Sequence, residues 1–151
     1  MLFRSDSEIV GIFTKISETL HKEPKYISHR DYHSRNLMIK FDKMCVIDFQ
    51  DARMGPVQYD LVSLIKDSYV DITDEYGQRI LSYYFDRAKD YKKTFDRDHF
   101  NHIYELQSIQ RCFKACGSFA SFFHQREDRR YLKYLTPTLK KVIKKIGRAH
   151  V

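Results

Sequence analysis

The segment that most constrains this chain is HRDYHSRN, which spans residues 29–36 and is followed by two short apolar runs. The runs cover residues 37–40 and 44–47, and the letters FDK lie between them with the composition of a turn. They are therefore predicted to form a β-hairpin, with Asp48 directly after its second strand. Because a hairpin returns the chain to its starting point, polar residues before and after it are expected to share one site.

The pattern H-R-D-x-x-x-x-N has a specific meaning in phosphoryl transfer. Asp31 is predicted to accept a hydrogen bond from a substrate hydroxyl and to orient it as the nucleophile. Asn36 and Asp48 are predicted to bind Mg²⁺, which prefers oxygen ligands, and Asp48 would bridge the metal to the nucleotide β- and γ-phosphates. A single Asp or Asn in a loop is usually a turn former. It is the order and spacing of all three that favour a catalytic site.

Two histidines in the segment allow a second interpretation. His29 and His33 are spaced as in the zinc helix motif H-E-x-x-H, but Arg30 occupies the position where that motif needs glutamate. The segment is also predicted to be a loop, so zinc is not expected. His29 is expected to brace the catalytic loop through hydrogen bonds, and His33 either to do the same or to contact substrate.

The rest of the chain is predicted to be mostly helical, which makes the fold class α+β with a predominance of α. Helical spacing of apolar residues covers residues 7–21, 59–70, 74–91 and 98–123, the last with a possible break near Gly117. Ser5 or Asp6 is expected to cap the first helix, and Thr136-Pro137 to open a final helix ending near residue 146. Residues 25–28 are expected to be extended and residues 49–58 to form a loop.

Composition excludes several classes of protein. The 151 residues contain five glycines, too scattered to build G-x-G-x-x-G or a Walker A loop. No apolar run reaches the length of about 18 residues that a membrane span needs, and the first residues lack the pattern of a secretory signal. Three cysteines do not make a disulfide framework, so a reducing, cytoplasmic location is expected. Cys112 and Cys116 are expected to be buried thiols.

The net charge is +7, with a basic run over residues 140–150. A solvated basic helix face is the favoured interpretation. Binding to nucleic acid or anionic lipid is a weaker alternative that is not expected, and attraction of anionic substrates is a third.

The string HRDYHSRNLM…VIDFQDARMGPVQYDLVSLIKD resembles the catalytic half of the aminoglycoside phosphotransferase and choline kinase superfamily, whose fold is protein-kinase-like. It is most similar to bacterial cell-wall sugar kinases that phosphorylate N-acetylmuramate and N-acetylglucosamine at the anomeric hydroxyl. The resemblance extends over about residues 26–146 and implies a cytoplasmic, ATP- and Mg²⁺-dependent kinase acting on an amino sugar. It implies that Asp31 is the base, that Asn36 and Asp48 hold metal, and that Asp60 ties its helix to the catalytic loop.

Two positions depart from the pattern of this superfamily. Aminoglycoside phosphotransferases usually have His-Gly-Asp where this chain has Arg30 in the middle, which argues against antibiotic resistance as the role. Asp51 is an extra carboxylate after Asp48-Phe49-Gln50, expected to be either a group near the substrate or a loop cap.

The residues before His29 do not match the N-terminal lobe of such a kinase. They are predicted to form one helix and one short strand, and Lys15, Lys22 and Lys25 lie in a helix or a loop, so none is assigned as the phosphate-binding lysine. Residues 1–151 are therefore expected to be a single partial domain, the C-terminal lobe, with the N-terminal lobe absent.

Two hypotheses follow from this partial domain. The first is an enzyme that works with a missing lobe supplied elsewhere. The second is a truncated, non-catalytic interaction module or inactive fragment, whose exposed surface binds a partner chain or a second copy of itself.

Overall fold

The computed structural model describes residues 5–89 and 96–146, which form a mostly helical chain with two small antiparallel sheets. This confirms a predominantly α, α+β composition. The helices are α1 (Asp6–Lys22), α2 (Gln58–Ile65), α3 (Asp74–Lys89), α4 (Arg97–Arg126) and α5 (Leu132–Ile146), with 3₁₀ turns η1 (Ser34–Asn36) and η2 (Arg129–Tyr131). The strands are β1 (Tyr26–Ser28), β2 (Leu37–Lys40), β3 (Lys43–Val46) and β4 (Arg53–Gly55).

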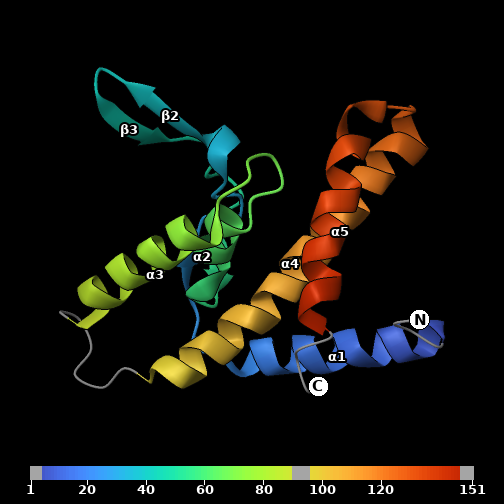
Figure 1. Cartoon of the computed structure of the whole chain (residues 1–151), viewed down its shortest axis with the longest axis horizontal. Helices are drawn as coiled ribbons and strands as arrows, with labels where there is room; N and C mark the ends of the chain where they lie inside the picture. The colour runs from blue at the N-terminus through green and yellow to red at the C-terminus, as the bar shows by residue number, and fades with distance from the viewer. Residues whose placement is uncertain (1–4, 90–95, 147–151) are drawn as a thin grey trace.

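Helix α4 is the central element of the fold. It runs diagonally through the molecule, with α5 alongside one half and α1 crossing near the other (Figure 1). Two hydrophobic clusters pack on it. The first joins α1, α4 and α5 through Ile16, Leu20, Ile103, Leu106, Ile109, Cys112 and Val142. The second joins α2, α3 and α4 through Val62, Ile65, Leu81, Phe85, Phe100 and Tyr104. Because α4 contributes to both, it fixes α2, which carries Asp60, relative to α5.

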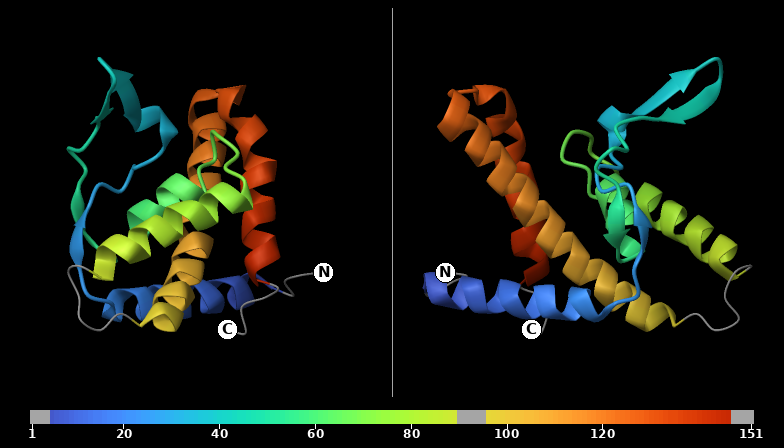
Figure 2. Two further views of the ribbon diagram at one scale, coloured as in Figure 1. Left: turned by 60° about the vertical axis from the view of Figure 1, so that its left-hand side comes forward. Right: turned by 180° about the vertical axis from the view of Figure 1, so that it is seen from behind.

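The predicted hairpin is present as β2 and β3, which project from the helical body (Figure 2). Its loop is the two-residue pair Phe41 and Asp42, with φ of 50° and 57°. Positive φ at both central residues is the requirement of a type I′ turn, whose twist matches that of the strands. Lys43 therefore pairs with Lys40 inside the ladder, where the sequence had indicated a turn residue.

A second sheet pairs β1 with β4, with Ser28 opposite Arg53 and Tyr26 opposite Gly55. Residues 53–55 were predicted to be loop, which was wrong. The signal was weak because the strand is short and Gly55-Pro56 is typical of a turn. A Cβ on Gly55 would lie 3.2 Å from the Ser28 hydroxyl, so glycine permits this close approach.

Helix boundaries differ from the sequence expectations in three places. Helix α2 ends at Ile65 instead of near residue 70, because the Asp67 carboxylate accepts the Tyr69 N–H at 2.7 Å and turns the chain. Helix α4 continues without a break through Gly117, where an added Cβ would meet nothing within 4 Å. Helix α5 begins at Leu132, with Pro137 inside it.

Other boundaries follow the expectations. The Ser5 side chain caps α1 by accepting the Glu8 N–H at 3.3 Å, which decides between the two predicted caps. Helix α3 is described as far as Lys89, and the two further residues expected in it lie outside the described ranges.

The cysteines and the basic C-terminal run also have a place in this fold. Cys112 and Cys116 are buried free thiols, as predicted, and burial raises the pKa of Cys116 to about 11. In the basic run, Lys141 donates a 2.7 Å hydrogen bond from Nζ to the Asp67 carbonyl, and residues from 147 onward lie outside the described ranges. Among the helices that the structure describes, none combines the length and apolar character needed to cross a bilayer.

Candidate active site

The backbone of the predicted catalytic loop is held by a carboxylate from helix α2. Asp60 accepts the His29 N–H at 2.7 Å through one oxygen and the Arg30 N–H at 2.9 Å through the other. Hydrogen bonds to an ionised acceptor are among the stronger ones in proteins. The two bonds to Asp60 hold the loop at Arg30, whose φ of 74° is strained for a side chain of this size. Asp60 thus makes the helix-to-loop tie that the resemblance implied.

A second carboxylate, which the sequence analysis did not identify, holds the other end of the loop. Asp67 is 2% exposed and accepts the Ser34 N–H at 2.8 Å, just before the position of Asn36. Its other oxygen accepts the Tyr69 N–H. No local pattern marks Asp67 in the sequence, because its partner at Ser34 is distant along the chain. The loop is therefore fixed from beneath by two carboxylates of one short segment.

His29 connects the catalytic loop to the strand that precedes Asp48. Its Nε2 lies 2.9 Å from the Ile47 carbonyl oxygen. Because a carbonyl only accepts, Nε2–H is the donor. The other ring nitrogen, Nδ1, is buried and has no hydrogen-bond partner among the residues that the structure describes. This contact is of the bracing kind predicted for His29.

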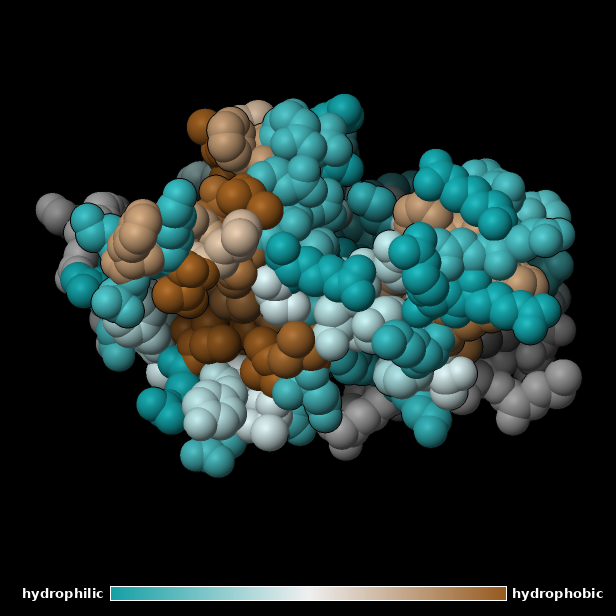
Figure 3. Space-filling model, turned by 90° about the horizontal axis from the view of Figure 1, so that it is seen from above, coloured by the Kyte–Doolittle hydropathy of each residue, from teal (hydrophilic) through white to brown (hydrophobic). Residues whose placement is uncertain are grey.

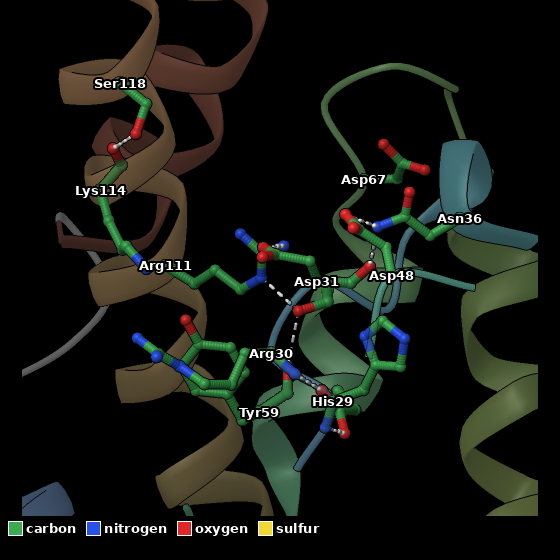
Figure 4. A network of polar contacts seen from close by, with 12 residues as sticks. His29, Arg30, Asp31, Asn36, Asp48, Tyr59, Asp67, Arg111, Lys114 and Ser118 are labelled. Carbon is green, nitrogen blue, oxygen red and sulfur yellow. Dashed lines mark hydrogen bonds and ion pairs between the residues drawn. The ribbon is translucent and has the colours of Figure 1, made fainter. Parts of the chain in front are cut away.

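Asn36 brings the three predicted site residues together (Figure 4). Its side-chain Nδ2 donates to the Asp31 backbone carbonyl at 2.9 Å and, over 3.3 Å, to the Asp48 carboxylate. Its backbone carbonyl accepts the Ile47 N–H at 3.0 Å. Asn36 is only 9% exposed, so these bonds fix one orientation of the amide between the loop and the hairpin.

Asp48 itself lies in a strained turn. Its φ is 69°, and the Gln50 side-chain amide donates to its Oδ1 at 2.6 Å. Positive φ at a non-glycine residue persists only where the surroundings enforce it, and such residues cluster at functional sites. Asp51 is exposed, and its carboxylate accepts no hydrogen bond from the described residues.

Arg111 of α4 is a further residue of this site that the sequence analysis missed. Its guanidinium lies 3.9 Å from the Asp31 carboxylate, hydrogen-bonds the Ser63 hydroxyl and sits over the Tyr59 ring at 5.7 Å. Figure 4 shows it crossing from α4 toward the catalytic loop. No local pattern marks Arg111 in the sequence, because its burial and its carboxylate partner both arise from the packing of distant segments.

The His33 ring packs against the segment that follows α2. It lies edge-on to the Tyr69 ring at 5.2 Å, and its Nδ1 is buried without a hydrogen-bond partner within residues 5–89 and 96–146. Burial lowers the pKa of His33 below its usual value of 6.5, against the opposing field of Asp67. The residue is therefore neutral at pH 7.

This geometry agrees with the comparison to protein families, in which a model described as the phosphotransferase enzyme family matches residues 5–94. The chain belongs to this family. Three curated phosphotransferase relatives are named N-acetylmuramate/N-acetylglucosamine kinase. The one from Neisseria meningitidis is 34% identical over 75% of this chain and 36% of its own length. Those from Pseudomonas putida and Pseudomonas aeruginosa are 36% and 35% identical, over 73% and 74% of this chain and 33% of their own lengths.

The chain spans about a third of the length of these phosphotransferase relatives. Its matched part includes the predicted catalytic loop and the hairpin, since both lie within residues 5–94. Family membership is therefore established on the part of the chain that carries Asp31, Asn36 and Asp48.

The chemistry of these three residues fits a phosphotransferase magnesium site. The Asn36 amide is anchored through its nitrogen, which leaves Oδ1 available as a ligand beside the Asp48 carboxylate. Mg²⁺ is usually bound through one or two protein groups plus substrate phosphates, and seldom by an all-protein cage. The described residues contain no cluster of three or more His, Cys, Asp or Glu side chains suited to a metal.

Proposed function

We propose that this chain supplies the catalytic and metal-binding part of a small-molecule kinase. The enzyme would transfer a phosphoryl group from ATP, with Mg²⁺, to a hydroxyl of an amino sugar such as N-acetylmuramate or N-acetylglucosamine. The observation that supports it most is the Asn36 amide, which hydrogen-bonds both the Asp31 carbonyl and the Asp48 carboxylate. These two bonds connect the residue proposed as the base to a residue proposed as a metal ligand, in a chain that belongs to a phosphotransferase family.

In this proposal Asp31 is the general base. Its side chain is 42% exposed, so a substrate hydroxyl can reach it. The sugar oxygen forms a bond to the γ-phosphorus, and the bond from that phosphorus to the β–γ bridging oxygen breaks. The hydroxyl proton passes to the Asp31 carboxylate, and ADP leaves. Mg²⁺ bound at Asn36 and Asp48 would neutralise charge on the phosphates.

We propose further that residues 1–151 correspond to the C-terminal lobe of a kinase-like fold. The phosphate-covering loop and the phosphate-binding lysine would then belong to another part of a longer protein. Lys15 and Lys22 lie on α1, and Lys25 is occupied by a 2.7 Å hydrogen bond from Nζ to the Leu20 carbonyl. The buried free thiols of Cys112 and Cys116 are compatible with the reducing cytoplasm, which we propose as the location.

The test is a phosphotransfer assay on the longest natural protein that carries this chain. We expect a sugar phosphate to form from ATP and either amino sugar, only when Mg²⁺ is present. Asp48→Ala should abolish Mg²⁺-dependent turnover, because it removes the main metal carboxylate, whereas Asp51→Ala should retain most of it. Wild-type turnover in Asp48→Ala would contradict the metal assignment.

A second candidate function is a non-catalytic interaction module. It is favoured by the apolar surface of the two sheets, where Ile27, Ile39 and Phe41 are 83%, 75% and 86% exposed. Figure 3 shows apolar atoms gathered over the half of the molecule that carries these strands. Absence of phosphotransfer by the longest natural protein, with tight association through this surface, would favour this candidate over the kinase.

A further inference from the structure

Arg35 is a cation on the catalytic loop that the proposed chemistry does not use. It lies in η1, directly before Asn36, and its side chain is exposed. The Asn36 side chain is buried toward Asp31 and Asp48, whereas Arg35 extends toward α5, where it donates to the Tyr134 hydroxyl at 3.3 Å. The two neighbouring side chains thus have different partners.

Three tyrosines hold the Arg35 guanidinium in place. Its Cζ lies 3.9 Å from the ring centroid of Tyr69, 5.8 Å from that of Tyr131 and 5.7 Å from that of Tyr134. We call these three rings the tyrosine seat. They come from the loop after α2, from η2 and from α5, and Tyr69 packs edge-on against Tyr134 at 5.1 Å. A guanidinium seated on aromatic faces keeps its N–H edges free for hydrogen bonding.

The seated guanidinium has no anionic partner. Within residues 5–89 and 96–146, no carboxylate lies within ion-pairing distance of Arg35, whereas Arg111 and Arg130 both pair with aspartates. An arginine that is fixed by rings, lacks a counter-ion and is exposed is suited to an anionic ligand. Its planar fork matches the two oxygens of a carboxylate.

Arg35 and the proposed base each contact one of the two packed helices α4 and α5. Asp31 is reached by Arg111 from α4, and Arg35 reaches the α5 tyrosine Tyr134. His33, between them in sequence, feels the charges of both Asp31 and Arg35. The side chains of Asn36 and Asp48, the predicted metal ligands, hydrogen-bond each other, whereas the Arg35 side chain contacts the tyrosine seat. The geometry therefore favours a ligand group on the acceptor sugar over a phosphate of the nucleotide.

We propose that Arg35, held by the tyrosine seat, binds the carboxylate of an acidic amino sugar and favours it over a neutral one. The inference rests on the proposed function and adds to it. N-acetylmuramate carries a carboxylate on its lactyl ether, and N-acetylglucosamine has none. Arg35 thus provides preference for the acidic substrate, while Asp31 acts on the hydroxyl of either.

The test compares Arg35→Met and Arg35→Lys with wild type in the longest natural protein that carries this chain. In Arg35→Met we expect kcat/KM for N-acetylmuramate to fall about 10- to 100-fold, the usual loss for a hydrogen bond to a charged group. The value for N-acetylglucosamine should stay within about twofold, as should the KM for ATP. Arg35→Lys should be intermediate because it keeps charge without the fork.

Arg79→Met is the matched control, since Arg79 is an exposed arginine of α3 that lies over the Tyr76 ring at 5.3 Å. We expect Arg79→Met to leave kcat/KM for both sugars unchanged. An equal loss with both sugars in Arg35→Met, or no loss with either, overturns the inference and leaves the kinase proposal intact. A rise confined to the KM for ATP also overturns it.

Turnover of neither sugar by the wild-type protein overturns the proposed function instead. The role of Arg35 is then tested by titrating the same protein with each sugar and following the Arg35 Nε–H signal by NMR. A shift with N-acetylmuramate that N-acetylglucosamine does not cause, and that Arg35→Met removes, supports the carboxylate site. The same response to both sugars, or none, overturns it.

Discussion

The guanidinium of Arg111 lies 3.9 Å from the carboxylate of Asp31, although the two residues come from α4 and from the catalytic loop. The Ser63 hydroxyl and the Tyr59 ring fix the arginine from α2. Arg111 therefore acts as a positioning residue that orients the proposed base. This contact also links the catalytic loop to α4, the helix that contributes to both hydrophobic clusters.

Replacing Arg111 should impair catalysis more than substrate binding. We expect Arg111→Met to lower kcat by about 10- to 100-fold with KM changed by less than about threefold, because small displacements of a base are costly. Arg111→Lys should restore part of kcat by returning a charge. Steady-state kinetics and a thermal melt would be measured together. A lower melting temperature with normal kcat at permissive temperature would assign Arg111 a structural role only.

Asp60 is predicted to contribute to stability through its two loop hydrogen bonds. Asp60→Ala leaves the N–H groups of His29 and Arg30 without their acceptor, which should cost about 2–4 kcal/mol of unfolding free energy. Urea denaturation, monitored by circular dichroism, measures this loss of unfolding free energy. The exposed Asp51 is the control, and Asp51→Ala should change stability by less than about 0.5 kcal/mol. Equal unfolding free energies for Asp60→Ala and Asp51→Ala would contradict this stabilising role of Asp60.

His33 should make stability depend on pH in one direction. Burial holds its pKa in the folded chain below the usual 6.5, so between these two pKa values the unfolded chain binds more protons than the folded one. The unfolding free energy should therefore rise with pH through this window and fall as pH drops below 6.5, by at most about 1.4 kcal/mol per pH unit.

The pH effect is isolated by comparing slopes. Denaturation of wild type and His33→Gln at several values from about pH 5 to 7 should show a steeper rise for wild type. His124→Gln, at an exposed position near the end of α4, should keep the wild-type slope. A His33→Gln slope equal to that of wild type would contradict the assignment.

The sequence was most informative where residues act close together along the chain. The spacing of Asp31, Asn36 and Asp48 around a hairpin predicted the geometry found, because a two-residue turn leaves little freedom in how its strands pair. Local rules also placed the cap of α1 at Ser5 or Asp6, of which the structure has Ser5, and predicted the burial of the two helical cysteines.

What the sequence could not supply are the contacts between distant segments. Asp67 reaches Ser34, and Arg111 reaches Asp31, only after α2 and α4 have packed together. Strand β4 exists because β1 lies beside it, and neither Arg53 nor Gly55 indicates a strand alone. The start of α5 at Leu132, ahead of Pro137, likewise overrides a local start signal.

The most direct test of the central claim is the kinetics of Asp31→Asn in the longest natural protein that carries this chain, with ATP, Mg²⁺ and an amino sugar. The substitution keeps size and hydrogen bonding but removes the base. We predict a fall in kcat of about 10²- to 10⁴-fold, with KM for the sugar within a few-fold of wild type. A kcat close to that of wild type would contradict the account of this site.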